Sequence, residues 1–460
     1  MERKDLILIL ASVGTFVEAL DIAIINLTIP SIQEQFGIGA ETVQWLQTLY
    51  VLFFGGFLII GGKLSDQIGR KKIFLLGSLI FMLTSLGAGL STGFETLAIF
   101  RALQGLGAAF IMPSAMSIVT NTFKEDQERN RAIGIFSSFA AIGSGSGLSL
   151  GGIISTYMSW HWVFLINVPI LLLTLIFAYQ YLPKDEAGNP QKTDLLSGIL
   201  LVLGLLSLTY GTHELIHIKE NTFMVAGSLA AAILLLVFVF YRLKSTSEPL
   251  IDLKLFKHKS LMVSNLAFIA LGGFFIGFLF LISLMLQKDM NYSAASAGLM
   301  LVPFSVMSAL VAKFILPHIS KRLNSSQMGI FGWIFMLSGA LALLISVYFD
   351  HPLTLVLIGA ACISGIGMTF CFTALSVLGI QDVNPSSYGV ASSLSSTSYF
   401  LGAGIGLSFM TLMSQIFPSK LAVGNLSLII LIGYAVFALG MLFYFIIKNI
   451  KIKQAEMVVS

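Results

Sequence analysis

Long apolar stretches separated by short polar connections run through the whole chain of 460 residues. A bilayer core about 30 Å thick requires roughly 17 to 25 apolar residues for one helical crossing. The stretches that reach this length lie near residues 5–27, 43–61, 73–92, 95–119, 133–157, 162–182, 195–213, 222–241, 261–286, 294–316, 327–348, 352–377, 388–416 and 425–447. The pattern therefore predicts an all-α polytopic membrane protein with about 14 transmembrane helices.

Composition supports the same class. Hydrophobic residues make up 56% of the chain and charged residues 10%, with a mean hydropathy of +0.92. An ordinary soluble domain carries about 25% charged residues, so a water-soluble core of this size is excluded.

Lysine and arginine positions test the number of spans, because these residues concentrate in the cytoplasmic loops of membrane proteins. With the N-terminus inside, only Lys219, Lys288 and Lys420 fall on the outer side, while Arg101 and Lys313 fall within spans. The cytoplasmic side receives Arg3, Lys4, Lys63, Arg70, Lys71, Lys72, Lys124, Arg129, Arg131, Lys184, Lys192, Arg242, Lys244, Lys254, Lys257, Lys259, Lys321, Arg322, Lys448, Lys451 and Lys453. This asymmetry predicts an even number of helices with both termini in the cytoplasm.

Two carboxylates in the first span are the first candidates for chemistry. Glu18 and Asp21 are three residues apart and therefore share one helix face. Charged groups are costly inside a membrane and mark proton or substrate pathways. Because two neighbouring carboxylates in a low-dielectric site disfavour simultaneous ionisation, the pair is a candidate proton site. Glu18 is equally a candidate recognition charge for cationic substrates.

Arg101 in the fourth span is the predicted partner of Asp21. At helical rise Asp21 lies about 14 Å, and Arg101 about 9 Å, from the outer ends of their spans. The two side chains are therefore expected to meet in the outer half of the membrane. The alternative is a structural ion pair that only fastens the first helix to the fourth. Lys313 lies near an inner helix end, where a long side chain can reach the interface.

Four uncharged polar side chains within spans are candidates for substrate binding beside Glu18 and Asp21. Gln47 and Tyr50 lie about one helical turn apart in the second span, and Gln104 and Asn167 lie in the fourth and sixth. The abundant Phe and Met residues offer a soft apolar lining for varied ligands.

The polar turn between the second and third spans, GKLSDQIGRKK at residues 62–72, resembles the signature loop of the major facilitator superfamily of transporters. Further stretches resemble its fourteen-helix drug:proton antiporter branch. They are LDIAIINLTIP at 20–30, RALQGLG at 101–107, WHWVFLINVP at 160–169, PLIDLKLF at 249–256 and GLMLVP at 298–303. The run GSGSGLSLGG at 143–152 resembles the antiporter motif of the superfamily, with Leu148 where that motif normally has proline.

The resemblance implies the major facilitator fold and roles for several residues. Asp21 and Arg101 would relay protons. Gly62, Asp66, Gly69 and Arg70 would form a conformational gate on the cytoplasmic side. In that gate the Asp66 carboxylate would dock against the N-terminus of the thirteenth span, near residues 384–386.

A faint internal repeat suggests how the chain is divided. LSDQIGR at 64–70 has a faded counterpart in ISKRLNS at 319–325, eight spans later. This offset predicts a six-helix bundle at 1–182, two inserted helices and a cytoplasmic linker at 183–260, and a second six-helix bundle at 261–460. Substrate sites in such repeats usually lie between the halves.

The leading hypothesis is a drug:proton antiporter of the bacterial cytoplasmic membrane that exports lipophilic or cationic compounds. A dedicated exporter of one metabolite, siderophore or lipid is the nearest alternative, and a non-transporting receptor on the same fold is another. Sodium in place of protons also stays open. We expect no enzymatic activity, no cofactor, no metal and no nucleic-acid partner. We do expect contacts with membrane lipids, and a monomer is the favoured oligomeric state.

Overall fold

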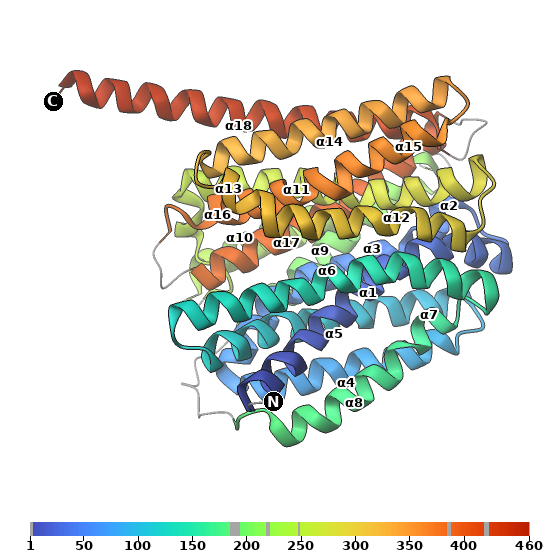
Figure 1. Cartoon of the computed structure of the whole chain (residues 1–460), viewed down its shortest axis with the longest axis horizontal. Coiled ribbons are helices and arrows are strands. Elements are labelled where there is room, and N and C mark those ends of the chain that lie inside the picture. The colour runs from blue at the N-terminus through green and yellow to red at the C-terminus, as the bar shows by residue number, and fades with distance from the viewer. Residues whose placement is uncertain are drawn as a thin grey trace.

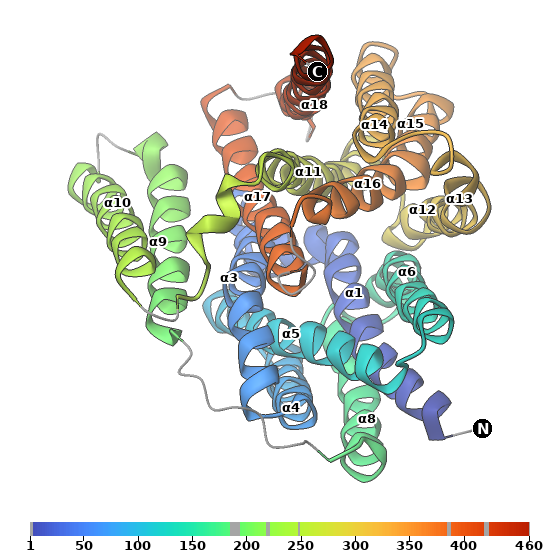
Figure 2. The ribbon, with the colours of Figure 1, turned by 90° about the vertical axis from the view of Figure 1, so that its left-hand side faces the viewer.

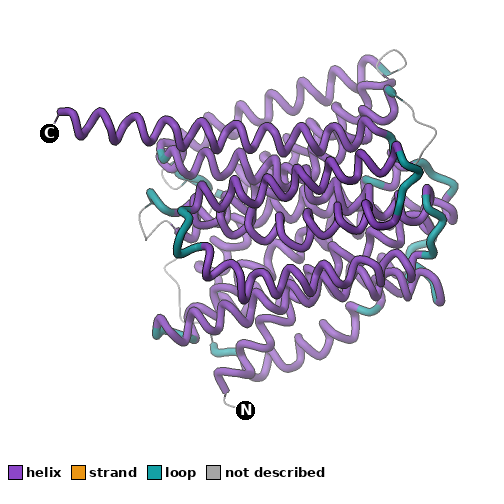
Figure 3. Tube along the Cα trace, turned by 45° about the horizontal axis from the view of Figure 1, so that its top comes forward, coloured by secondary structure: helices purple, strands orange, loops and turns teal. Residues whose placement is uncertain are grey.

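The computed structural model describes residues 3–184, 194–217, 221–246, 249–383, 388–417 and 423–459. Within these residues 14 helical spans are long and apolar enough to cross a membrane, which confirms the predicted number. The spans run roughly side by side and their connections gather at the two ends of the bundle (Figures 1 and 3). The predicted all-α architecture is confirmed.

The elements follow one another as α1 (Arg3–Phe36), α2 (Ala40–Val43), α3 (Trp45–Ile68), α4 (Arg70–Gly89), α5 (Phe94–Thr122), α6 (Asp126–Tyr157), α7 (Trp162–Leu165), α8 (Asn167–Tyr181), α9 (Leu195–His213), η1 (Glu214–His217), α10 (Thr222–Ser245), η2 (Leu253–Lys257), α11 (Lys259–Leu284), η3 (Met285–Asp289), α12 (Ala294–Leu310), η4 (Val311–Ile315), α13 (Leu316–Ile319), α14 (Ser325–Tyr348), α15 (Leu353–Ala360), η5 (Ala361–Gly367), α16 (Met368–Ile380), α17 (Tyr388–Ile416) and α18 (Asn425–Val459). We call the end of the bundle that holds residues 62–72 the inner end, and the opposite end the outer end.

Helices α1–α8 form one group and helices α11–α18 another, which we call the N-terminal and C-terminal groups (Figure 2). In the N-terminal group, α1 packs along α6. A Cβ atom at Gly143, Gly147 or Gly151 of α6 would collide with the backbone of α1. These glycines recur every four residues, so one face of α6 approaches α1 closely.

Around α6 and α12 the two groups meet through the outer halves of their helices, whereas α3 and α17 also pack together at the inner end, where Ile59 and Leu394 share a buried cluster. Thr156 Oγ1 of α6 accepts a hydrogen bond from the Ala295 backbone of α12 at 2.9 Å, and Ser283 of α11 donates to the Asn26 carbonyl of α1. Gly152 of α6 also lies directly against the backbone of Ala294. Towards the inner end, a cavity of about 880 Å³ separates α6 from α12. On the α6–α12 side the structure is therefore closed at the outer end and grooved at the inner end.

Helices α9 and α10 pack against each other, and α9 also contacts both α3 and α17 (Figure 2). Asp194 caps the N-terminus of α9, where its carboxylate accepts the Ser197 backbone N–H at 3.2 Å. The same carboxylate pairs with Arg242 of α10 at 2.9 Å. Because Asp194 is buried and Arg242 is partly exposed, this pair fastens the two helices at the inner end.

Asp194→Asn is expected to lower the free energy of unfolding by about 1 kcal/mol, since it removes a charged cap and a partly screened ion pair. Burial acts to raise the pKa of Asp194, but hydrogen bonds from Ser197 and Arg242 outweigh it and lower that pKa below its ordinary value of 3.8. The stabilisation is therefore present above pH 3.8 and lost as the pH falls through the lower folded-state pKa. Thermal unfolding of the detergent-solubilised protein between pH 7 and pH 3 measures this.

The matched control is Glu128→Gln, which removes one partner of the exposed ion pair between Lys4 and Glu128. Exposed pairs contribute little to stability, so this variant should unfold like the wild type. A loss of stability for Asp194→Asn that stayed constant down to pH 3 would contradict the proposed role of the ionised carboxylate.

Candidate functional site: a buried polar cluster between α1, α3, α5 and α8

Asp21 and Arg101 face each other in the protein interior, as their depths in the sequence predicted. Both side chains are fully buried, and Arg101 Nη1 forms an ion pair with Asp21 Oδ2. A buried ion pair recovers its desolvation cost only if additional hydrogen bonds satisfy its remaining polar atoms. The neighbouring helices supply several of these bonds.

Asn167 and Gln104 complete the surroundings of the carboxylate. Asn167, the first residue of α8, donates from Nδ2 to Asp21 Oδ1 at 3.0 Å. Gln104 lies one turn after Arg101 on α5 and accepts from its Nη1 at 3.0 Å. Gln104 Nε2 is 3.5 Å from Asp21 Oδ1 and donates to Ser85 of α4 at 2.8 Å. Side chains of α5 and α8 therefore converge on the carboxylate carried by α1, and Ser85 of α4 supports Gln104 from behind.

The guanidinium of Arg101 is also held from the other side. Its Nε donates to the Leu46 carbonyl of α3 at 3.1 Å. Its Cζ lies 4.4 Å from the ring centroid of Tyr50 and 5.8 Å from that of Phe164, which are favourable cation–π distances. The arginine therefore keeps a backbone bond and an aromatic support that do not depend on the charge of Asp21.

Several buried polar atoms at the cluster have no hydrogen-bond partner in the described part of the chain. They are Nη2 of Arg101, Oδ1 of Asn167, the hydroxyl of Tyr50 and both amide atoms of Gln47. An unsatisfied buried polar group costs about 1 to 3 kcal/mol, so such atoms are suited to a ligand or a rearranged state. Gln47 lies on α3 three residues before Tyr50, and its side chain forms no hydrogen bond within the described residues.

Glu18 lies almost one turn before Asp21 on α1 and is 7% exposed. No hydrogen bond or ion pair joins its carboxylate to another described residue. It acts electrostatically on Asp21, on Tyr50 of α3 and on Tyr399 of α17. Glu18 is thus the acidic residue of the cluster that lies towards the C-terminal group.

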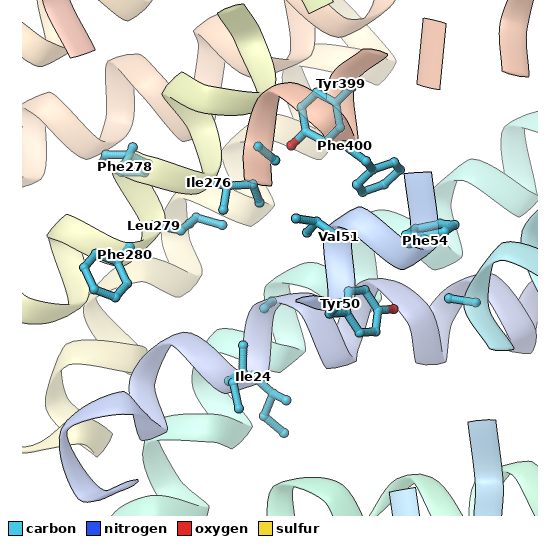
Figure 4. Close-up of a cluster of buried hydrophobic side chains, with 14 of the residues drawn as sticks. Ile24, Tyr50, Val51, Phe54, Ile276, Phe278, Leu279, Phe280, Tyr399 and Phe400 are labelled. Atoms are coloured by element: carbon cyan, nitrogen blue, oxygen red, sulfur yellow. The ribbon is translucent and has the colours of Figure 1, made fainter. Parts of the chain in front are cut away.

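An apolar wall adjoins this cluster where α3 faces α11 and α17 (Figure 4). The ring centroids of Phe54 and Phe400 are 4.2 Å apart, and those of Tyr399 and Phe400 are 5.1 Å apart. Sequence reasoning missed Tyr399, Phe400 and Ser85. The sequence analysis looked for charged residues within spans. In the C-terminal group that search found only Lys313, so the uncharged residues of α17 were not singled out.

The four predicted gate residues lie together at the inner end, away from the buried cluster. Gly69 separates α3 from α4 and has a φ of 122°, a conformation that favours glycine. Asp66 interacts electrostatically with Arg70 across this turn. A Cβ atom added at Gly62 would lie at ordinary van der Waals distance from Pro113 of α5. The expected docking partner of Asp66, residues 384–386, lies outside the described residues.

Comparisons with known proteins agree with this architecture. A family model for the Major Facilitator Superfamily matches residues 11–407. "Cephamycin export protein CmcT" of Amycolatopsis lactamdurans is 31% identical over 412 residues, covering 88% of this chain and 83% of that protein. "Multidrug resistance protein Stp" of Mycobacterium tuberculosis (strain CDC 1551 / Oshkosh) is 29% identical, covering 89% and 76%. The crystal structure of a D-xylose-proton symporter shares the fold with a TM-score of 0.68 at 15% identity, covering 96% and 97%. The chain therefore belongs to the Major Facilitator Superfamily and is a multipass membrane protein.

Proposed function

We propose that this chain is a secondary transporter that exports lipophilic or cationic small molecules in exchange for protons, by alternating access. The observation that carries the proposal is the fully buried Asp21–Arg101 pair, whose arginine is held independently by Leu46 and Tyr50. Relatives named for cephamycin export and multidrug resistance support export of small antibiotic-like molecules. The superfamily consists of transporters rather than enzymes, so the prediction of no enzymatic activity is confirmed by the family.

In this proposal the proton and the substrate compete for the same acidic cluster. Protonation of Asp21 removes the charge that attracts Arg101, and the guanidinium relaxes onto Tyr50 and the Leu46 carbonyl. A cationic substrate arriving from the inner end favours loss of that proton, because a positive charge stabilises an ionised carboxylate nearby. Glu18 serves as a second proton site or as the recognition charge for the substrate.

The proposed substrate contacts come from both sides of the cluster. Glu18, Asp21, Gln104 and Asn167 provide polar contacts, and Gln47 and Tyr50 carry buried atoms with no partner in the described residues. The aromatic wall of Tyr399 and Phe400 adds apolar surface from the C-terminal group. This mixture of a few polar groups and large apolar side chains is typical of small-molecule sites.

Alternating access requires two bodies that move against each other. We assign residues 1–182 and 261–460 to the two six-helix bundles, and 183–260 to the inserted helices with their linker. The grouping of contacts into N-terminal and C-terminal groups supports this division. We place both termini in the cytoplasm of a bacterium, with the protein as a monomer in the inner membrane, because Lys and Arg gather in the loops at the inner end.

Gly62, Asp66, Gly69 and Arg70 would form the gate at the inner end. When that end closes, the Asp66 carboxylate is proposed to dock against the N-terminus of α17, where the helix dipole favours negative charge by about 0.3 to 1 kcal/mol. Asp66 is exposed in this inward-grooved structure, which supports a contact made only in the other state.

Asp66→Ala is expected to slow transport about two- to fivefold without changing substrate affinity, because only the closed-inside state loses the dipole contact. Transport rate and equilibrium substrate binding, measured on the same purified protein, check this. Asp66→Glu keeps the charge and should retain most of the activity. Wild-type turnover of Asp66→Ala would remove Asp66 from the gate.

Transport into inverted vesicles tests the function as a whole. A lipophilic cation such as ethidium should accumulate when the vesicle interior is acidic, and the accumulation should collapse when a protonophore removes the gradient. A sodium gradient in place of the proton gradient separates the two coupling ions. A receptor that does not transport predicts no accumulation under either gradient, and a dedicated exporter predicts accumulation of few tested compounds.

A further inference from the structure

The groove between the inner halves of α6 and α12 is distinct from the buried cluster on α1. It has a volume of about 880 Å³. Its walls are mostly apolar or hydroxyl-bearing, with Ile142 and Ser149 on α6 facing Val306 and Ala309 on α12. Figure 2 shows α6 and α12 side by side at the edge of the bundle.

The groove opens towards the bilayer. Ile135 and Ile142 line it, and Ile153 lies on the same face of α6, 11 residues after Ile142. Ile153 is 38% exposed in the outer half, where α6 and α12 are in contact, so this face of the helix points to lipid. Ile142 is 59% exposed and Val306, on the opposite wall, 53% exposed.

Two cations stand at the inner mouth of the groove. Arg131 of α6 and Lys313 of η4 both line it and are both exposed. Among the described residues neither forms a hydrogen bond or ion pair, and Lys313 Nζ lies 5.3 Å from the ring centroid of Phe314. None of the groove-lining residues is acidic. The mouth therefore presents a net positive charge.

The position of these cations matches the level of lipid headgroups. Lys313 lies six residues before the end of α13, about 9 Å at helical rise, and its side chain is long enough to reach the interface. From Lys313 to Val302 the apolar wall extends roughly 16 Å deeper into the membrane. A charged mouth with an apolar slot behind it complements an amphiphile with an anionic head.

On the opposite side of the bundle the two groups are also in contact at the inner end. There α9 covers the contact between α3 and α17. The linker adds a buried cluster in which Leu250 and Ile251 pack with Ile59, Leu261 and Leu394 at the inner end. Lateral access from the inner leaflet is thus on the α6–α12 side.

We propose that this groove is a binding site for an anionic phospholipid of the inner leaflet. Its phosphate binds Arg131 and Lys313, and one acyl chain lies along Ile142, Val306 and Ala309. The lipid fills space that α6 and α12 must occupy when the inner end closes. Its occupancy therefore favours the inward-open state.

The test measures binding of spin-labelled phosphatidylglycerol to the full-length protein in nanodiscs otherwise made of phosphatidylcholine. The double variant Arg131→Gln/Lys313→Gln should lose roughly 30-fold in affinity, because each cation near an anionic headgroup is worth about a factor of five. The matched control Lys244→Gln/Lys448→Gln removes two exposed cations from α10 and α18 and should change affinity less than about twofold.

A second pair of variants probes the slot without changing charge. Ala309→Trp fills the groove and should abolish the immobilised lipid signal, whereas Leu299→Trp, on an exposed outer part of the same helix, should leave it unchanged. Equal binding of phosphatidylcholine, or unaltered phosphatidylglycerol binding by both groove variants, would overturn the proposal. Displacement of the lipid by millimolar inorganic phosphate would also overturn it, in favour of a site for a free anion.

Discussion

Asp21→Asn is expected to abolish proton-driven accumulation of substrate while leaving the protein folded. Asparagine keeps the shape of the side chain and one oxygen, which can replace either the Oδ2 that accepts from Arg101 or the Oδ1 that accepts from Asn167. It cannot release or take up a proton at neutral pH. A gradient of about 2 pH units sustains a roughly 100-fold accumulation when one proton is exchanged per substrate, so the accumulation ratio of the variant should fall to about 1.

The measurement is the steady-state ratio of a lipophilic cation in inverted vesicles with an acidic interior. The matched control is Glu34→Gln, which neutralises an exposed carboxylate on the same helix and should keep the full ratio. Downhill exchange of substrate without a gradient should persist in Asp21→Asn, because the alternation of the two groups does not itself consume a proton. A variant that still accumulated substrate 100-fold would place the coupling site elsewhere.

The fold and part of the site follow from the sequence because a membrane restricts what a chain can do. Every crossing must satisfy its own backbone hydrogen bonds, so each long apolar stretch becomes a helix. An isolated charge inside a membrane is costly, so Asp21 is expected to have a partner of opposite charge. Arg101 is the arginine at a similar depth, and the two were therefore predicted to pair. Gln104 and Asn167 were found as polar side chains at compatible positions.

The remaining parts of the cluster depend on packing that no local pattern records. Ser85 is one of many serines in spans, and nothing in its neighbourhood distinguishes it from those that bond their own helix, as Thr84 does. The stacking of Tyr50 on Arg101 depends on how α3 packs against α5. Tyr399 and Phe400 lie near α3 because the two groups pack against each other. That packing depends on both groups together, so it cannot be read from the sequence of either group alone.

Arg101→Gln is expected to cost about 3 to 5 kcal/mol of stability, because it leaves Asp21 as an uncompensated buried charge. Arg242→Gln is the matched control, since its pair with Asp194 is partly exposed and should cost about 1 kcal/mol. Asp21→Asn/Arg101→Gln removes both charges together. It should be more stable than the sum of the two single losses predicts, by a coupling of up to about 3 kcal/mol.

Transport by the double variant decides what the pair is for. A pair that only fastens α1 to α5 predicts that recovered stability brings recovered transport, since an uncharged pair of similar shape still packs between the helices. A pair that relays protons predicts a stable protein with an accumulation ratio of about 1, because neither remaining side chain can carry a proton. Thermal unfolding and vesicle transport, measured on the same preparations, separate these outcomes. Full accumulation by the double variant would make the Asp21–Arg101 pair a structural contact and leave Glu18 as the acid of the cluster that remains to carry the proton.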